Sequence, residues 1–183
     1  RNSASPGDTD GIGQIQFNGQ NSAGEKIMYA SIFAETDDVT DGTENGALVF
    51  NLEDGGALNR MVQIGTDETV FNTNGLDINF RVESDDNTHM IFVDAGNDHV
   101  NIGTSTDYGG VLNVLSTDTN DTLTLVSTDN GSNAGPDLVL FRDSSSPADN
   151  DFMGSINFRG DDSGGNVSTY AQIIARALDV TSA

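Results

Sequence analysis

Apolar side chains recur along the chain in short runs that alternate with polar residues and end at Gly, Asn, Asp, Ser or Thr. In residues 13–19, GQIQFNG, the alternation is typical of a half-buried strand. Two glycines at 55–56 predict a tight reversal, so residues 47–54 and 59–66 form a predicted hairpin. Further runs predict strands at 77–84, 89–95, 99–104, 111–117, 121–128 and 136–143. The pattern predicts an all-β chain of about a dozen short strands, with little or no helix.

The opening segment of the chain occurs twice. Residues 1–42 and 142–183 align without a gap and agree at about 19 positions, far more than shared composition would produce. The matched positions are Pro, Asp and Gly of connecting loops and apolar residues of strands, among them Pro6/Pro147, Gly19/Gly160, Gly24/Gly165, Ile15/Ile156 and Ile32/Ile173. The repeat preserves a fold pattern rather than a cluster of reactive side chains. We expect a piece of a longer repeating polypeptide, with one full period and the opening third of the next.

Residues 26–39, KIMYASIFAETDDV, are compatible with a strand or a helix. The apolar residues of the matching segment in the second copy would also form a helical stripe. A strand is favoured because the pattern Ala-x-Ile-x-Ala at 30–34 recurs in both copies, on one side of a period of two. Position 35 holds Glu35 in the first copy and Arg176 in the second, which predicts a side chain that either faces solvent or is adaptable.

The predicted strands fall into four segments along the chain. Residues 1–71 form the first copy of a β-repeat module, and residues 72–110 form a module of short hairpins. Residues 111–141 form a further short-strand module, and residues 142–183 begin a second, truncated copy of the repeat.

The formal net charge is −22, from 29 acidic and 7 basic residues. Because such a surface repels phosphate groups, we expect no binding to nucleic acid or to an anionic membrane. Solubility through self-repulsion explains the acidity, with adaptation to salty water or binding of divalent cations as alternatives. The chain has no Cys, so disulfides and thiolate chemistry are excluded, and no apolar run is long enough for membrane insertion.

Two stretches resemble structural proteins of tailed phages. Residues 77–106, DINFRVESDDNTHMIFVDAGNDHVNIGTST, look like a segment of tail fibres of marine and other phages, and residues 145–173, SSPADNDFMGSINFRGDDSGGNVSTYAQI, resemble a repeat in the same proteins. The resemblance implies short-strand repeat modules in an elongated, homotrimeric fibre, similar to a β-sandwich, β-prism or β-helix. It implies a virion tail appendage that supports host attachment, with other tail proteins as partners and a host surface receptor bound through a distal region. The alternative is a bacterial extracellular adhesin or filament at the cell surface, built of similar β-repeats.

Two pairs of aspartates occupy matching positions of the two copies, Asp8 with Asp10 and Asp149 with Asp151. Carboxylate oxygens suit a hard cation such as Ca²⁺. The Gly and Glu that complete an EF-hand loop do not follow in register, so turn formation is favoured and a calcium site is the alternative. No other cofactor is expected.

The remaining chemistry-bearing residues predict no enzyme. His89 and His99 lack the His-x-His spacing of metal sites in fibres of the resembled family and are expected at strand ends. Acidic pairs lie in predicted turns, where Asp bonds the local backbone. No nucleophile elbow, phosphate loop or metalloprotease helix is present. A carbohydrate-binding module would need exposed aromatics, and the chain offers no Trp and only Tyr29, Tyr108 and Tyr170.

Overall fold

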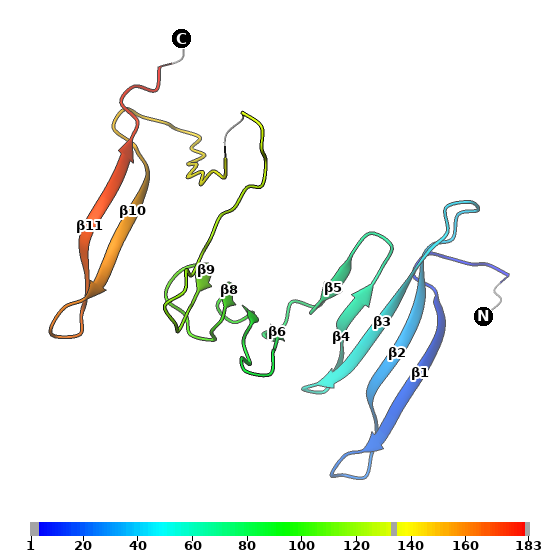
Figure 1. The fold of residues 1–183 in the computed structure, drawn as a ribbon. Coiled ribbons are helices and arrows are strands. Elements are labelled where there is room, and N and C mark those ends of the chain that lie inside the picture. The colour runs from blue at the N-terminus through cyan, green and yellow to red at the C-terminus, as the bar shows by residue number, and fades with distance from the viewer. Residues whose placement is uncertain (1–3, 133–134, 182–183) are drawn as a thin grey trace. The chain divides into compact units, whose positions relative to one another are not determined.

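The computed structural model describes residues 4–132 and 135–181, whose regular structure consists of β-strands alone (Figure 1). The prediction of an all-β chain is therefore confirmed for these residues. None of the described sheets closes on itself. The chain divides into two compact units, residues 1–123 and residues 124–183.

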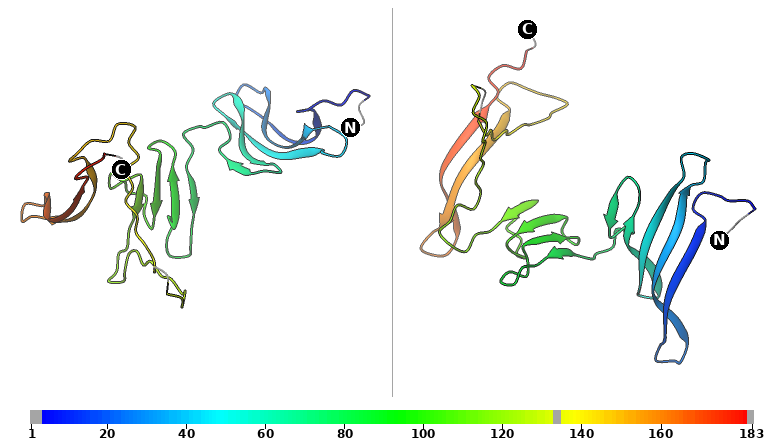
Figure 2. Two further views of the ribbon diagram at one scale, coloured as in Figure 1. Left: turned by 90° about the horizontal axis from the view of Figure 1, so that it is seen from above. Right: turned by 45° about the vertical axis from the view of Figure 1, so that its right-hand side comes forward.

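The first five strands form one antiparallel sheet in chain order, and this sheet is twisted and curved (Figures 1 and 2). Residues 26–39 form a strand, as predicted. The hairpin predicted around Gly55 and Gly56 is also present, and both glycines have positive φ. The short fifth strand was not predicted. The strands are β1 (Gly11–Gln20), β2 (Lys26–Asp38), β3 (Asn45–Asp54), β4 (Ala57–Ile64) and β5 (Thr69–Phe71).

One face of this sheet is apolar across all five strands. The register brings side chains of neighbouring strands into three rows on this face, which is called the apolar face below. The central row consists of Ile15, Ile32, Phe50, Val62 and Phe71. The flanking rows are Phe17, Ala30, Leu52 and Asn59 on one side, and Gly13, Ala34, Leu48, Ile64 and Thr69 on the other.

The opposite face contains the buried part of the sheet. Val49, at its centre, is completely buried, and Ala47 beside it is nearly so. Ser31 and Asn51 are also buried, and the Asn51 side-chain amide donates a hydrogen bond to Ser31 Oγ at 3.1 Å. Burial of these polar groups is tolerated because they bond each other.

A second sheet contains β6 (Phe80–Val82), β7 (Ile91–Asp94), β8 (His99–Ile102) and β9 (Leu112–Val114). Its last pair, β8 and β9, is parallel, with Asn101 opposite Asn113. Both asparagines are buried, and the Asn113 side-chain amide donates to Asn101 Oδ1 at 2.7 Å. Gly103 follows β8 with φ of 82°, and a Cβ there would lie 2.5 Å from the Leu115 carbonyl oxygen. The close approach of the two parallel segments therefore requires glycine at 103.

The second copy of the repeat forms a hairpin of β10 (Phe152–Asp161) and β11 (Val167–Arg176). Its register matches that of β1 and β2 at every pair once the offset of 141 is applied, including two irregularities at equivalent positions. Thr9 and Asn150 both have positive φ, as do Gly24 and Gly165 in the turns between the strands. The two copies of the sequence therefore give the same backbone hairpin.

The strands predicted at 121–128 and 136–143 are wrong, because neither segment is a strand in the structure. Their apolar side chains are exposed, including Leu123, Val126 and Phe141. A strand exists only where a neighbouring strand accepts its backbone hydrogen bonds, and the described residues supply no such neighbour. Alternation alone did not reveal this lack of a partner.

Candidate functional site

The aspartates proposed as cation ligands each bond a backbone amide at the open end of the first hairpin. Asp8 Oδ1 accepts from the Val39 amide at 3.1 Å, and Asp10 Oδ2 accepts from the Gly7 amide at 3.1 Å. The Thr36 hydroxyl donates to the Gly7 carbonyl at 2.9 Å. These bonds connect the segment before β1 to the residues at the end of β2.

The second hairpin has the same arrangement. Asp149 Oδ1 accepts from the Val180 amide at 3.0 Å, and Asp151 Oδ2 accepts from the Ala148 amide at 3.0 Å. Arg142 Nη1 also lies 3.0 Å from Asp151 Oδ2. The aspartates that recur in both copies therefore accept hydrogen bonds from backbone amides that hold the loop before each hairpin and close its open end; they are called the aspartate clamps below. This agrees with turn formation, the interpretation that the sequence favoured.

A calcium site at these aspartates has no geometric support. Among the described residues, no group of three or more His, Cys, Asp or Glu side chains is placed to hold a metal ion. A Ca²⁺ site needs six to eight oxygen ligands around one point. Asp8 and Asp10 instead direct oxygens to amides of Val39 and Gly7, which lie in different segments.

The two histidines contact different partners. The Thr88 hydroxyl lies 2.9 Å from His89 Nδ1, and the His89 ring packs edge-on against Phe92. His99 is the first residue of β8, and its Nδ1 lies 3.2 Å from Asp107 Oδ2. His99 therefore occupies a strand end. His89 lies just before β7, separated from its first residue, Ile91, by Met90.

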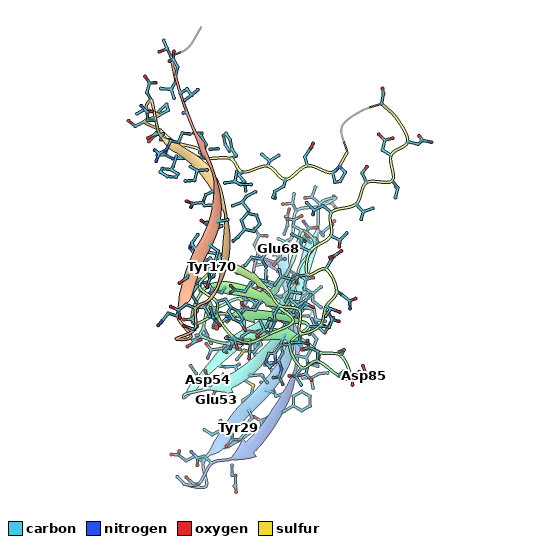
Figure 3. All side chains as sticks on the ribbon, turned by 60° about the vertical axis from the view of Figure 1, so that its left-hand side comes forward. Tyr29, Glu53, Asp54, Glu68, Asp85 and Tyr170 are labelled. Atoms are coloured by element: carbon cyan, nitrogen blue, oxygen red, sulfur yellow. The ribbon has the colours of Figure 1, made fainter. Side chains whose placement is uncertain are left out.

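Two tyrosines hold the turn ends of their hairpins (Figure 3). The Tyr29 hydroxyl donates to the Gln20 carbonyl at 3.3 Å, and the Tyr170 hydroxyl donates to the Asp161 carbonyl at 3.1 Å. The Tyr29 ring lies against Gly19, where an added Cβ would come within 3.0 Å of the ring. These two repeated tyrosines have a structural role that accounts for their recurrence.

Glu35 is buried, so of the two predicted alternatives for position 35 the solvent-facing one is wrong. Only 4% of the residue is exposed, and both carboxylate oxygens accept from the Arg60 guanidinium, at 2.6 and 2.8 Å. The ion pair spans β3 from β2 to β4, so it lies over the completely buried Val49. In the second copy Arg176 instead stacks on the Phe152 ring, 3.9 Å from its centroid.

A bulge in β4 places Arg60 on this buried face. Phe50 pairs with Val62, but Asn51 pairs with Arg60, so one residue of β4 is extra. Without the bulge, Arg60 would face the same side as Leu52 and enter the apolar face. The ion pair was missed because a one-residue bulge has no signal in the sequence. The available hint was one Glu and one Arg in two apolar strands, β2 and β4, that lie on either side of β3.

Four aspartates, three of them exposed and Asp38 half-buried, have lowered pKa values because backbone amides and hydroxyls bond their carboxylates. In Asp162 the amides of Asn166 and Gly164 lower the pKa, and in Asp38 the Thr40 amide is the largest cause. Asp118 and Asp179 have lowered pKa values for the same kind of reason, with the Ser116 hydroxyl and the Thr181 amide as the respective largest causes. Such shifts belong to turns and indicate no acid–base pair.

The apolar face is the most extensive exposed apolar feature that the structure and the repeat share. At its β5 edge the Phe71 ring contacts the Phe80 ring of β6, with centroids 4.9 Å apart, and the rest of the face is left open by the described residues around Ile15 and Phe17. In the central stretch of each hairpin, residues 13–17 with 30–35 and residues 154–158 with 171–176, side chains on this face are identical in the two copies, and those on the opposite face all differ. Nearer the turn the identity ends, because Ile27 in the first copy is Ser168 in the second. The identical pairs are Gly13/Gly154, Ile15/Ile156, Phe17/Phe158, Ala30/Ala171, Ile32/Ile173 and Ala34/Ala175. The differing pairs are Gln14/Ser155, Gln16/Asn157, Ser31/Gln172, Phe33/Ile174 and Glu35/Arg176.

Comparisons of the chain with protein-family models, with curated proteins and with solved structures find no match. The structure has no helix, among the residues it describes, that could cross a membrane. The residues themselves are therefore the basis for assigning a function.

Proposed function

We propose that this chain is a structural segment of a phage tail fibre or of a similar virion appendage, and that it supports host attachment. Its role is mechanical: copies of the chain associate, as a homotrimer, and hold a distal receptor-binding region away from the particle. No catalytic step is part of this role.

The observation that carries the proposal is the large surface that the chain leaves exposed. The accessible area is 13625 Å² for a chain of 19.2 kDa. Two separate compact domains with the sizes of the two units would together expose about 10,000 Å². The chain thus buries much less surface than an independently stable domain, and association with other chains is the usual remedy.

The repeat also supports a fibre segment. Two hairpins with one register, separated by 141 residues, are what a lengthwise repeating structure would contain. Their shared residues either shape the backbone or lie on the apolar face. The resemblance of residues 77–106 and 145–173 to phage tail fibres agrees with this interpretation.

The proposal is tested by locating the protein. Antibodies raised against the recombinant chain should label tail appendages in immunogold electron microscopy of virions from the source sample. Capsid and tail genes are expected beside the complete reading frame. Labelling of bacterial surfaces, with secretion genes as neighbours, would overturn the virion proposal in favour of an extracellular adhesin or filament.

A further inference from the structure

We propose that the apolar face of the first sheet and the equivalent face of the β10–β11 hairpin are the surfaces through which copies of this chain contact one another. This inference rests on the proposed self-association and names the part of the chain that carries it. The occupant of each face is a second copy of the same chain.

The first argument is the exposure of large apolar side chains. Ile15 and Phe17 are 59% and 52% exposed, and Ile156 and Phe158 are 42% and 53% exposed. Leu52, in a flanking row, is 49% exposed. Side chains of this size on contiguous rows of one sheet form a patch that soluble monomers seldom leave open.

The second argument is the difference between the two copies of the hairpin. Selection for solubility alone would let an exposed face change, yet all six compared positions of this face are identical. The opposite face differs at all five compared positions, although Ser31 and Glu35 are buried there in the first sheet. Contacts within the chain do not explain this identity, because Leu140 lies 3.2 Å from where a Cβ of Gly154 would be, whereas nothing lies within 4 Å at the equivalent Gly13. A neighbouring copy of the chain would supply a contact that both faces share.

The third argument is charge. Copies that each carry a net charge of −22 repel one another. None of the three rows of the apolar face contains a charged residue. Contact through this face therefore brings no carboxylates together, whereas contact through the loops would.

The fourth argument is area. The exposed surface of 13625 Å² exceeds that of two compact domains with the sizes of the two units by about 3,500 Å². Obligate interfaces bury roughly 1,000–2,500 Å² on each partner. The excess is therefore large enough to contain interfaces with more than one neighbouring copy, as a homotrimer requires.

The test compares two matched double variants of the 183-residue chain. Ile15→Lys with Ile156→Lys changes the apolar face, and Gln16→Lys with Asn157→Lys changes the next residue in each strand, on the opposite face. All four positions are exposed, and both variants change the net charge by the same amount. Because added lysines reduce repulsion between acidic chains, charge alone would strengthen association equally in both variants.

Sedimentation velocity over a concentration series at about 0.15 M NaCl, with circular dichroism to confirm strand content, gives the result. We expect the wild type and the opposite-face variant to assemble, and the apolar-face variant to associate about 100-fold more weakly or not at all. Assembly of all three would overturn the assignment of this face but leave self-association standing. A folded, monomeric wild type would overturn both.

Cross-linking keeps the proposal testable if lysine on the apolar face prevents folding. The chain has no Cys, so Ile15→Cys and Gln16→Cys each introduce a unique thiol. A short bis-maleimide should link Ile15→Cys chains to each other at micromolar concentration and leave Gln16→Cys chains mostly unlinked. Equal linking of the two variants would contradict the proposed contact.

Discussion

Glu35 and Arg60 form a two-point ion pair that spans the central strand β3. Glu35 is 5% exposed at its side chain and Arg60 37%, so the pair is partly shielded from water. The pair lies over Val49 on the buried face of the sheet, whereas Ile15 and Phe17 on the apolar face are more than half exposed.

Replacing Glu35 should damage the fold. Glu35→Lys removes the carboxylate and places a second cation beside Arg60 in a site with little solvent. We expect a loss of about 2–4 kcal/mol in the free energy of unfolding, between values for exposed and fully buried pairs. The control is Glu44→Lys, an exposed position with the same charge change, which should cost less than about 1 kcal/mol. Urea denaturation at fixed protein concentration measures both, and equal losses would show that the ion pair contributes nothing special.

Glycine at 103 should be essential for the parallel pair of β8 and β9. Gly103→Ala requires a positive φ and brings Cβ within 2.5 Å of the Leu115 carbonyl oxygen. Gly109→Ala is the matched control, since Gly109 has φ of 86° but open space around it. We expect the control to lose about 1–2 kcal/mol and Gly103→Ala to lose more. Urea denaturation, followed by the circular dichroism signal of the β-strands, measures the free energy of unfolding of both variants. Indistinguishable losses would contradict the steric argument.

The residues at the positive-φ position before each hairpin differ between the two copies, so each can be replaced by the residue of the other copy. Thr9 has φ of 64° and Asn150 has φ of 68°. Asn tolerates this conformation, whereas a β-branched residue is strained in it. We therefore expect Thr9→Asn to raise the free energy of unfolding by about 1 kcal/mol and Asn150→Thr to lower it by a similar amount. Changes of the same sign in thermal melts of the two variants would refute the strain.

The turn of the second hairpin should be sensitive to acid, unlike the turn of the first. The amides of Asn166 and Gly164 lower the pKa of Asp162 below its ordinary value of 3.8. Its contribution to stability is therefore present above pH 3.8 and is lost as the pH falls through the lowered pKa. Asn21 makes the equivalent bonds in the first hairpin and does not titrate.

Nuclear magnetic resonance titration of the Gly164 and Asn166 amides should show this transition. The equivalent first-hairpin amide of Ala23, which donates to Asn21 Oδ1, is the control and should not share it. Asp162→Asn should abolish the transition at the second turn. Its persistence in that variant would assign the acid response to another group.

Salt should stabilise the assembly by screening, and calcium should add nothing beyond screening. The Debye length falls from about 30 Å at 0.01 M to about 10 Å at 0.1 M ionic strength, which weakens repulsion between acidic chains. Asp8 and Asp10 are engaged with backbone amides and do not converge on one point. Thermal melting with sodium exchanged for calcium at fixed ionic strength tests this, and a further rise with calcium would restore a cation site.

The sequence predicted the hairpins well because their turns and alternation are local. The β1–β2 and β10–β11 hairpins follow from period-two patterns with glycines at the turns, and the Ala-x-Ile-x-Ala motif correctly selected strand over helix at residues 26–39. The site was predicted less well. Turn formation by Asp8 and Asp10 was anticipated, but burial of Glu35 depends on a bulge near Met61 that no local pattern encodes.

Features that depend on distant partners could not be predicted. The parallel pairing of β8 with β9 depends on a close approach at Gly103, which becomes visible only when the two segments lie side by side. The segments 121–128 and 136–143 have the alternation of strands but lack partners in the described chain. Alternation in the sequence indicates which side chains share a face of a strand. Whether the strand forms depends on another strand lying beside its backbone, which the local sequence does not encode.

The aspartate clamps determine where a pulling force would enter each hairpin. The two strands of a hairpin are connected to the rest of the chain at its open end, opposite the turn. Tension applied to these two connections would therefore load the cross-strand hydrogen bonds one after another, starting at the open end. The hydrogen bonds from the Val39 amide to Asp8 and from the Val180 amide to Asp149 lie at this open end, so they are among the first to be loaded. The aspartates that were considered as cation ligands therefore lie where a hairpin pulled by its two ends would begin to open.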